Sequence, residues 1–191
     1  MRSVWEEKKG RHMEKPTIIT FSGQARHGKD TAVQILKGIL ISQGKKPLAI
    51  NYTDYLKFVA AQYLGWDGNK DENGRSFLQM LGTEKVNPVN PSFWVDTVIR
   101  TVDIIGSGFD FVLIGDCRFI HDITRWTEEG YRILPFHVTR LNFENELSEA
   151  QRNHATEVSL NGYRFTGYLS ANDIPELENE VAAQVVPLLN L

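Results

Sequence analysis

The stretch GQARHGKDT, residues 23–31, constrains the fold more than any other part of the sequence. Gly23, Gly28 and Lys29 have the G-x-x-x-x-G-K spacing of a phosphate-binding loop. In such a loop, glycines let main-chain N–H groups converge on an anion, and the following helix N-terminus adds positive partial charge. The hydroxyl residue that normally follows the lysine comes one position late, at Thr31. The alternative interpretation is an ordinary strand-to-helix turn with a solvated lysine.

The residues around the loop alternate between strand and helix patterns. A β-branched run at 17–22 precedes the loop, and apolar residues at helical spacing follow it over 29–42. The alternation continues along the chain, with strands expected at 47–51, 109–114, 133–139 and 163–170 and helices at 55–64, 76–81, 92–105, 122–129 and 175–189. It predicts an α/β fold with a parallel sheet and helices on both faces.

The chain is expected to form one domain over 17–191, after a flexible tail at 1–16. Two polar segments interrupt the alternation. We expect 65–74 to be a loop, with Thr53 or Asp54 capping the helix before it, and 142–162 to be a lid.

Composition excludes several classes of protein. A net charge of −3 argues against a nucleic-acid-binding surface. Apolar runs are too short for a membrane span, and the N-terminus lacks the apolar core of a signal peptide. The single Cys117 excludes an internal disulfide and favours a reducing compartment. These features indicate a cytoplasmic protein without a membrane partner.

Two carboxylates are candidate Mg²⁺ ligands. Asp30 stands where phosphate loops usually carry a metal-binding hydroxyl, and Mg²⁺ prefers hard oxygen ligands. Asp116 ends the apolar run FVLIGD, the position of a strand-end metal acid in such folds. The alternative for Asp30 is a first-turn acid that the helix dipole favours.

Six motifs together resemble one known family. They are GKDT at 28–31, YTDYLK at 52–57, FLQMLGTE at 77–84, SFWVDTVI at 92–99, GDCRF at 115–119 and HATE at 154–157. In this order they resemble the deoxynucleoside monophosphate kinases of bacteriophages and some bacteria, over roughly residues 17–180. The resemblance implies a three-layer P-loop kinase fold, ATP as donor, Mg²⁺, a deoxynucleoside monophosphate as acceptor, and a homodimer. It also leads us to expect an arginine shortly after Glu84, where Lys85 is the only cation.

The residues expected to act fall into three sets. The ATP-binding set is Gly23, Arg26, His27, Gly28, Lys29, Asp30 and Thr31. The cations expected to stabilise the transferring phosphoryl group are Lys29, Arg118, Arg140 and Arg152. The resemblance places the acceptor pocket at Asp54, Lys57, Arg75, Gln79 and Trp94, and His154 and Glu157 either grip the acceptor or pair with each other at the surface. We expect Lys29 to be largely solvated before ligand binds.

Other functions share parts of this pattern. GKDT also occurs in a phosphomevalonate kinase family, and a nucleotide-binding regulator needs a phosphate loop without transfer chemistry. The segment NKDE at 69–72 is similar to a guanine-recognition signature, but it ends in Glu72 and precedes the Asp116 strand, which argues against a GTPase.

Overall fold

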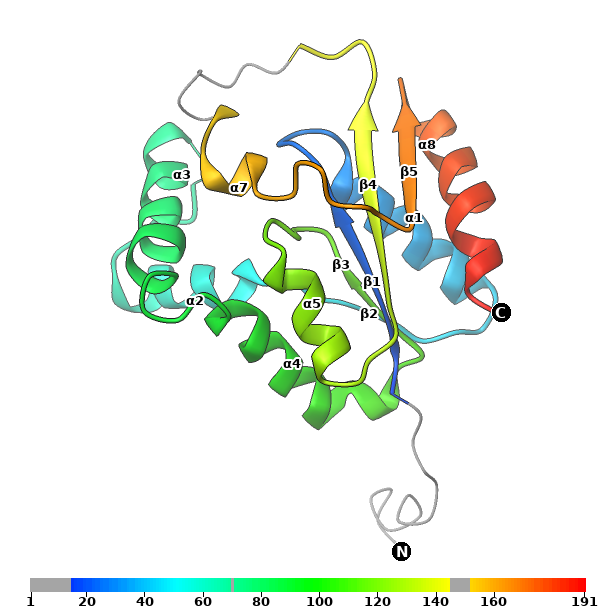
Figure 1. Ribbon diagram of the computed structural model, residues 1–191, viewed down its shortest axis with the longest axis horizontal. Helices are drawn as coiled ribbons and strands as arrows, with labels where there is room; N and C mark the ends of the chain where they lie inside the picture. Colours follow the sequence, from blue (N-terminus) through cyan, green and yellow to red (C-terminus); the bar gives the residue numbers. More distant parts are fainter. Residues whose placement is uncertain (1–14, 70, 145–151) are drawn as a thin grey trace, which may run out of the picture.

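A computed structural model describes residues 15–69, 71–144 and 152–191 of the chain. Its centre is a sheet of five parallel strands in the order β2-β3-β1-β4-β5 (Figure 1). The strands are β1 Thr17–Ser22, β2 Pro47–Ala49, β3 Phe111–Ile114, β4 Ile133–Arg140 and β5 Gly167–Ala171. The predicted parallel sheet is therefore confirmed.

Helices cover both faces of the sheet, as the alternating pattern predicts. One face packs against α1 (Lys29–Ser42) and α8 (Ile174–Glu180), which continues as η3 (Val181–Val185) and η4 (Val186–Leu188). The other face packs against α4 (Phe93–Ile105), which ends in η2 (Gly106–Gly108), and against α5 (His121–Glu128). Ile18 packs into the core beneath α4 and α5, and the next residue, Ile19, packs into the core beneath α1 and α8. The two residues face opposite ways because side chains alternate across a strand.

The remaining elements stand beyond the carboxyl ends of the strands. They are α2 (Thr53–Tyr63), α3 (Glu72–Gln79), the π-helical η1 (Met80–Val86) and α7 (Ala155–Val158). Figure 1 shows α3 and α7 on the same side of the molecule, away from β5. Together they surround the end of the sheet at which the phosphate loop lies.

Element types agree with the sequence prediction, but three local details were wrong. The expected loop at 65–74 is shorter, because α3 begins at Glu72, where the Asp71 side chain accepts a 2.8 Å hydrogen bond from the Gly74 N–H. The helix expected at 76–81 continues as a π-helix to Val86. Neither Thr53 nor Asp54 caps α2, since both lie inside it.

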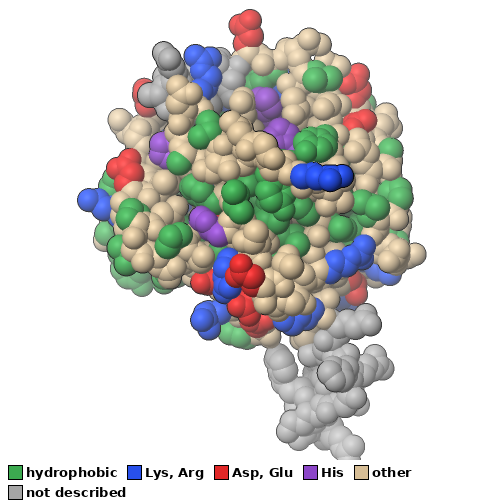
Figure 2. All heavy atoms as spheres, in the orientation of Figure 1, with side chains coloured by type: hydrophobic (Ala, Val, Ile, Leu, Met, Phe, Trp, Pro, Cys, Tyr) green, Lys and Arg blue, Asp and Glu red, His purple; other side chains and the backbone are tan. Residues whose placement is uncertain are grey.

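Parts of two predicted segments lie outside the described residues. The expected tail is described only from residue 15, and the expected lid only over 142–144 and 152–162. Within the described part of the chain, no helix combines the length and apolar character needed to cross a membrane. Basic and acidic side chains are interspersed over the face shown in Figure 2.

Strand order places the phosphate loop at the middle of the sheet. β1 lies between β3 and β4. The chain therefore first places β2 and β3 on one side of β1 and later places β4 and β5 on the other. The carboxyl ends of parallel strands form a crevice at such a switch point. Segments that follow β1, β3 and β4 therefore meet there.

Candidate functional site

The loop between β1 and α1 has backbone conformations that only glycine adopts readily. Gly23 has φ 134° and Gly28 has φ 92°, both in the left-handed half of conformational space. A Cβ on Gly23 would lie 2.3 Å from the Val138 carbonyl oxygen. Gly28 is the N-cap residue of α1, so the loop leads directly into the helix N-terminus. This is the geometry of an anion-binding loop.

Gly23→Ala is expected to lower the free energy of unfolding by about 2 kcal/mol or more and to abolish nucleotide binding. The added methyl meets β4 backbone, which cannot move aside as a side chain can. Urea unfolding and titration with an ATP analogue measure the two effects.

Gly38→Ala is the matched control for that variant. Gly38 lies within α1, and an added Cβ meets nothing within 4 Å. Since alanine favours a helix over glycine by roughly 0.5–1 kcal/mol, this variant should gain stability and keep nucleotide binding. Equal stability of Gly23→Ala and the parent would contradict the close contact with Val138.

Lys29 is buried, which corrects the expectation that it is largely solvated. Its side chain folds back, and the ammonium donates 2.8 Å hydrogen bonds to the carbonyl oxygens of Gly23 and Gln24. Only 7 % of the residue is exposed. The pKa of Lys29 is lowered to about 8, mostly because the ammonium is buried and further because the Arg118 cation is nearby. The ammonium therefore sits on the loop, held by loop carbonyls.

The Asp30 side chain is exposed and lies against the end of β3. A Cβ on Gly115 would come within 2.9 Å of Asp30 Oδ1. The Gly115 N–H donates to Asn51 Oδ1 at 3.1 Å, so the ends of β1, β2 and β3 converge here. α1 has no side-chain cap, and Asp30 is the acid of its first turn. An oxygen ligand is therefore available beside the loop.

Asp116 joins the β3 end to α2. Its carboxylate accepts hydrogen bonds from the N–H groups of Tyr52 and Thr53, each at 3.0 Å, and from the Thr53 hydroxyl at 2.7 Å. Asp116 thus takes the capping role predicted for residues of α2 itself. Oδ1 accepts only one of these bonds, and a carboxylate oxygen has about two acceptor directions. One direction remains for a metal ion or its water.

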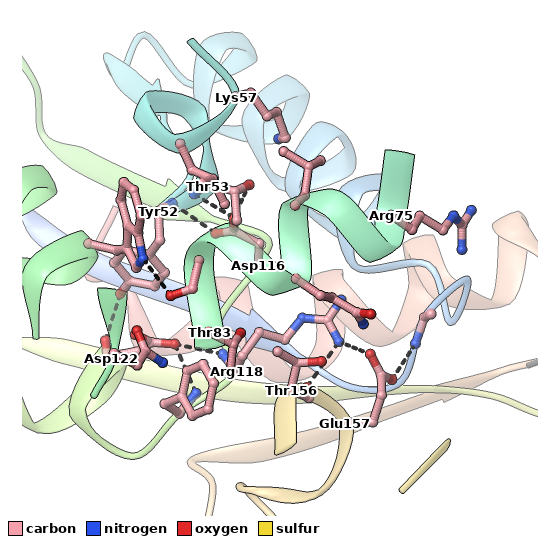
Figure 3. A pocket seen from close by; sticks show the side chains of 18 of the residues that line it. Tyr52, Thr53, Lys57, Arg75, Thr83, Asp116, Arg118, Asp122, Thr156 and Glu157 are labelled. Carbon is pink, nitrogen blue, oxygen red and sulfur yellow. Dashed lines mark hydrogen bonds and ion pairs between the residues drawn. The ribbon is translucent and has the colours of Figure 1, made fainter. Parts of the chain in front are cut away.

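A cavity of about 290 Å³ opens between α2, α3 and the loop, and is called here the α2–α3 cavity (Figure 3). Four predicted acceptor-pocket residues line it, namely Lys57, Arg75, Gln79 and Trp94. Asp54 does not: it is half exposed, accepts from the Asn51 N–H at 2.8 Å and pairs with Lys57 at 3.5 Å. Residues that the sequence analysis did not single out complete the wall, among them Tyr52, Thr83, Asn87, Phe119, His121 and Thr156.

Arg118 and Glu157 point toward each other at the loop side of this cavity (Figure 3). The Arg118 guanidinium pairs with Glu157 and also donates to the Thr156 carbonyl oxygen at 3.2 Å. The other Glu157 oxygen accepts from the Ala25 N–H of the loop at 3.0 Å. The fold thus brings together two predicted site residues, Arg118 and Glu157, beside the phosphate loop.

Asp122 is a buried carboxyl that sequence reasoning missed. Its Oδ2 accepts from the N–H groups of Arg118 and Phe119, each at 2.8 Å. Tyr52 donates from its hydroxyl to the Asp122 carbonyl oxygen at 2.6 Å and accepts from Trp126 at 2.8 Å. Asp122 therefore holds the backbone that carries Arg118. An acid four residues after an arginine is too common a pattern to reveal this role.

Burial raises the pKa of Asp122 to about 7, against the opposing effect of the two N–H donors. The native state then binds more protons than the unfolded state between about pH 4 and pH 7. The stability that Asp122 contributes is present below that window and is lost as pH rises through it. We expect this contribution of Asp122 to stability to be lost between pH 5 and pH 8, and Asp122→Asn to remove that part of the parent's pH dependence.

Thermal melts across this pH range measure the effect, with Asp110→Asn as control. Asp110 is exposed and accepts a backbone hydrogen bond from Lys46 at 2.8 Å, so its amide variant controls for the replacement of one hydrogen-bonded carboxylate by an amide. An Asp122→Asn curve parallel to the parent's would contradict the raised pKa.

A second cavity, of about 210 Å³, lies between the loop and α8 and is called here the α8 cavity. The predicted residues that line it are Arg26, His27, Gly28, Thr31 and Arg140. Arg140 lies over the Phe143 ring at 4.5 Å, and its N–H donates to His27 Nδ1 at 3.3 Å. Burial and then Lys29 lower the pKa of His27, which favours the neutral imidazole.

Arg152, His154 and Lys85 line neither of these cavities. Arg152 is exposed. His154 is the N-cap of α7, and its Nδ1 lies 2.9 Å from the Thr156 hydroxyl. His154 and Glu157 therefore contact different groups. Lys85 is exposed, and Arg75, ten residues earlier, lines the α2–α3 cavity instead.

Among solved structures, two of the Mycobacterium tuberculosis APS kinase CysC are similar to this chain. The complex with AMPPNP and APS has a TM-score of 0.51 at 10 % identity and covers 90 % of this chain and 98 % of its own. A cysteine-to-alanine mutant has a TM-score of 0.48 with the same identity and coverage. At this identity the similarity concerns the fold alone, and the predicted P-loop kinase fold is confirmed.

No curated protein matches the sequence. The family described as deoxynucleotide monophosphate kinase matches over residues 41–173, more than half of the chain. The matched segment begins after the phosphate loop, so the loop geometry is an independent observation. The matched segment includes the α2–α3 cavity wall apart from Ala25, together with Asp116 and the pair formed by Arg118 and Glu157. The chain therefore belongs to the deoxynucleotide monophosphate kinase family.

Proposed function

We propose that the protein transfers the γ-phosphoryl group of ATP to a deoxynucleoside monophosphate. The observation that carries the proposal is a shared residue: Arg118 lines the α2–α3 cavity and contacts, through Glu157, the phosphate loop. A phosphoryl group between donor and acceptor needs positive charge from both sides. Family membership supports a nucleotide as the substrate.

The donor is proposed to bind along the loop and into the α8 cavity. The loop N–H groups, the N-terminus of α1 and the Lys29 ammonium suit the phosphates. The α8 cavity, with Arg140 and the neutral His27, extends from the loop toward β5 and is proposed to receive the adenosine. The APS kinase of similar fold is described in complex with AMPPNP, which agrees with ATP as donor.

The acceptor is proposed to bind in the α2–α3 cavity. Lys57 and Arg75, which line the same cavity as Arg118, are proposed to supply further positive charge for its phosphate. Gln79 and Asn87 offer amides that can hydrogen-bond a base, and Trp94 offers an aromatic surface. The Trp94 ring is held in place by a 3.2 Å hydrogen bond from its N–H to the Gly82 carbonyl oxygen.

Asp30 and Asp116 are proposed to hold Mg²⁺, which would offset charge on the donor phosphates. No group of three or more His, Cys, Asp or Glu side chains suited to a metal occurs among the described residues. Mg²⁺ often binds through one or two carboxylates, with phosphates and water completing its shell. An exposed Asp30 beside the β3 end and the remaining acceptor direction of Asp116 fit that arrangement.

Asp30→Asn is expected to raise the Mg²⁺ concentration for half-maximal rate by roughly tenfold, because one ligand loses its charge. Asp30→Ser restores the usual hydroxyl ligand and should retain more activity than Asp30→Ala. Thr31→Ala, the neighbouring control, should weaken ATP binding with little change in Mg²⁺ demand. A Mg²⁺ titration of Asp30→Asn that overlays the parent curve, with only thermal stability lowered, would assign Asp30 to the helix dipole instead.

A screen of acceptors tests the proposed function. Common and modified deoxynucleoside monophosphates are incubated with ATP and Mg²⁺, and diphosphates are separated by chromatography. The expected result is ADP release that depends on one or a few of these monophosphates. ATP binding without any diphosphate product would favour the regulator, and ADP release with phosphomevalonate alone would favour the other kinase class.

A further inference from the structure

The Glu157 carboxylate reaches from α7 to the phosphate loop, which lies 132 residues away along the chain. One oxygen accepts from the Ala25 N–H at 3.0 Å, and the other pairs with Arg118. The Glu157 side chain is only 6 % exposed. A buried carboxylate is costly unless its charge is paired, so these two contacts account for its position.

The groups around this carboxylate are those that bind a phosphate. They are a main-chain N–H of the glycine-containing loop, an arginine and, close by, the buried Lys29 ammonium. Burial and then Arg118 lower the pKa of Lys29, and the Glu157 charge acts in the opposite sense.

Glu157 and Arg118 also stand between two cavities. Both line the α2–α3 cavity and a neighbouring cavity of about 240 Å³ beside β4, whose wall includes Gln24 and His137. The pair therefore occupies the space where a group bridging the loop and the acceptor would lie.

We infer that Glu157 occupies, in this structure, the position that a substrate phosphate takes, and that it is displaced when the donor binds. The inference rests on the proposed function and assigns Glu157 a role opposite to gripping the acceptor. The phosphates of ATP and the Glu157 carboxylate are all negatively charged and need the same N–H and guanidinium groups. They therefore cannot occupy this buried site at the same time. Displacement frees the Arg118 guanidinium for the transferring group.

The experiment measures binding of AMPPNP and of tripolyphosphate by calorimetry at fixed Mg²⁺. The parent is compared with Glu157→Gln and Glu157→Ala. Removing the competing charge is expected to lower the Kd of both ligands by roughly tenfold. Alanine should have the larger effect, because a glutamine amide oxygen can still accept from Ala25. Deoxynucleoside monophosphate affinity should not fall in either variant, because the Glu157 carboxylate also lines the acceptor cavity and repels a phosphate there.

Glu128→Gln is the matched control. Glu128 pairs with Arg125 on α5 and lines none of the three cavities described, so this variant also removes one carboxylate from an arginine pair. Its Kd values should equal those of the parent.

Each outcome decides the inference separately from the proposed function. Equal or weaker AMPPNP binding by both Glu157 variants overturns the inference while leaving the kinase proposal intact. Weaker monophosphate binding by Glu157→Gln assigns Glu157 to the acceptor and likewise overturns it. Failure of AMPPNP to bind any variant, the parent included, overturns the inference and the proposed function together.

Discussion

Lys29→Ala is expected to reduce turnover by roughly 10²–10³-fold, because the variant lacks the ammonium that neutralises charge on the donor phosphates. The structure holds this ammonium on the loop carbonyls of Gly23 and Gln24, so little reorganisation is needed when phosphates replace them. Steady-state rates at saturating ATP and acceptor measure the effect.

The burial of Lys29 also predicts an effect on stability. Alanine leaves two loop carbonyls without their donor, which costs about 1–3 kcal/mol for each group that stays buried and unpaired. Removal of a desolvated ammonium offsets part of that loss. Lys29→Met keeps the apolar stem and should lose as much turnover as alanine with a smaller loss of packing.

Lys37→Ala is the control, because Lys37 lies two turns further along α1 and lines neither cavity. Its turnover should match the parent's. A Lys29→Ala rate within threefold of the parent would remove the lysine from the mechanism, whatever the variant's stability.

Arg118→Ala is expected to lower kcat by about 10³-fold, with a smaller change in KM for either substrate. The guanidinium is proposed to act mainly on charge that develops as the phosphoryl group moves. Arg118→Lys should recover only part of the rate, since an ammonium lacks the planar fork that binds two oxygens at once.

Arg125→Ala is the control for Arg118→Ala. It shows whether losing an arginine and its ion pairs is by itself enough to lower kcat. Arg125 contacts Asp96, Glu128 and Glu129, and its side chain is 27 % exposed against 23 % for Arg118. Its removal should lower thermal stability and leave kcat unchanged. A comparable fall in kcat for both variants would indicate that Arg118 acts only through the fold.

The predicted lid over 142–162 remains a proposal. The described part shows that its last section is α7 with the turn after it, and that α7 places Thr156 and Glu157 in the wall of the α2–α3 cavity. Slower hydrogen exchange over 152–162 with a bisubstrate analogue would support closure of this segment over the site.

Local sequence determined the frame of the molecule. Strand periodicity at 17–22, helical spacing at 29–42 and the glycines between them are short-range signals, because each depends on backbone preference or on the alternation of side chains within one element. The parallel sheet followed from repetition of those signals. The boundaries of α3 and its π-helical extension did not, since they depend on contacts such as that of Asp71 with Gly74.

Tertiary structure alone decided how the site residues are partnered. Asp116 caps a helix that begins 63 residues earlier, and Glu157 reaches a loop 132 residues before it. Asp54 and His154 turn instead to neighbours within three residues. The physical reason is that a charged side chain goes to whichever donors the fold leaves unsatisfied nearby, and sequence spacing does not reveal which donors those are. The sequence by itself therefore determined where the glycine-containing loop lies, and the packing of α2, α5 and α7 around that loop decided which side chains meet it.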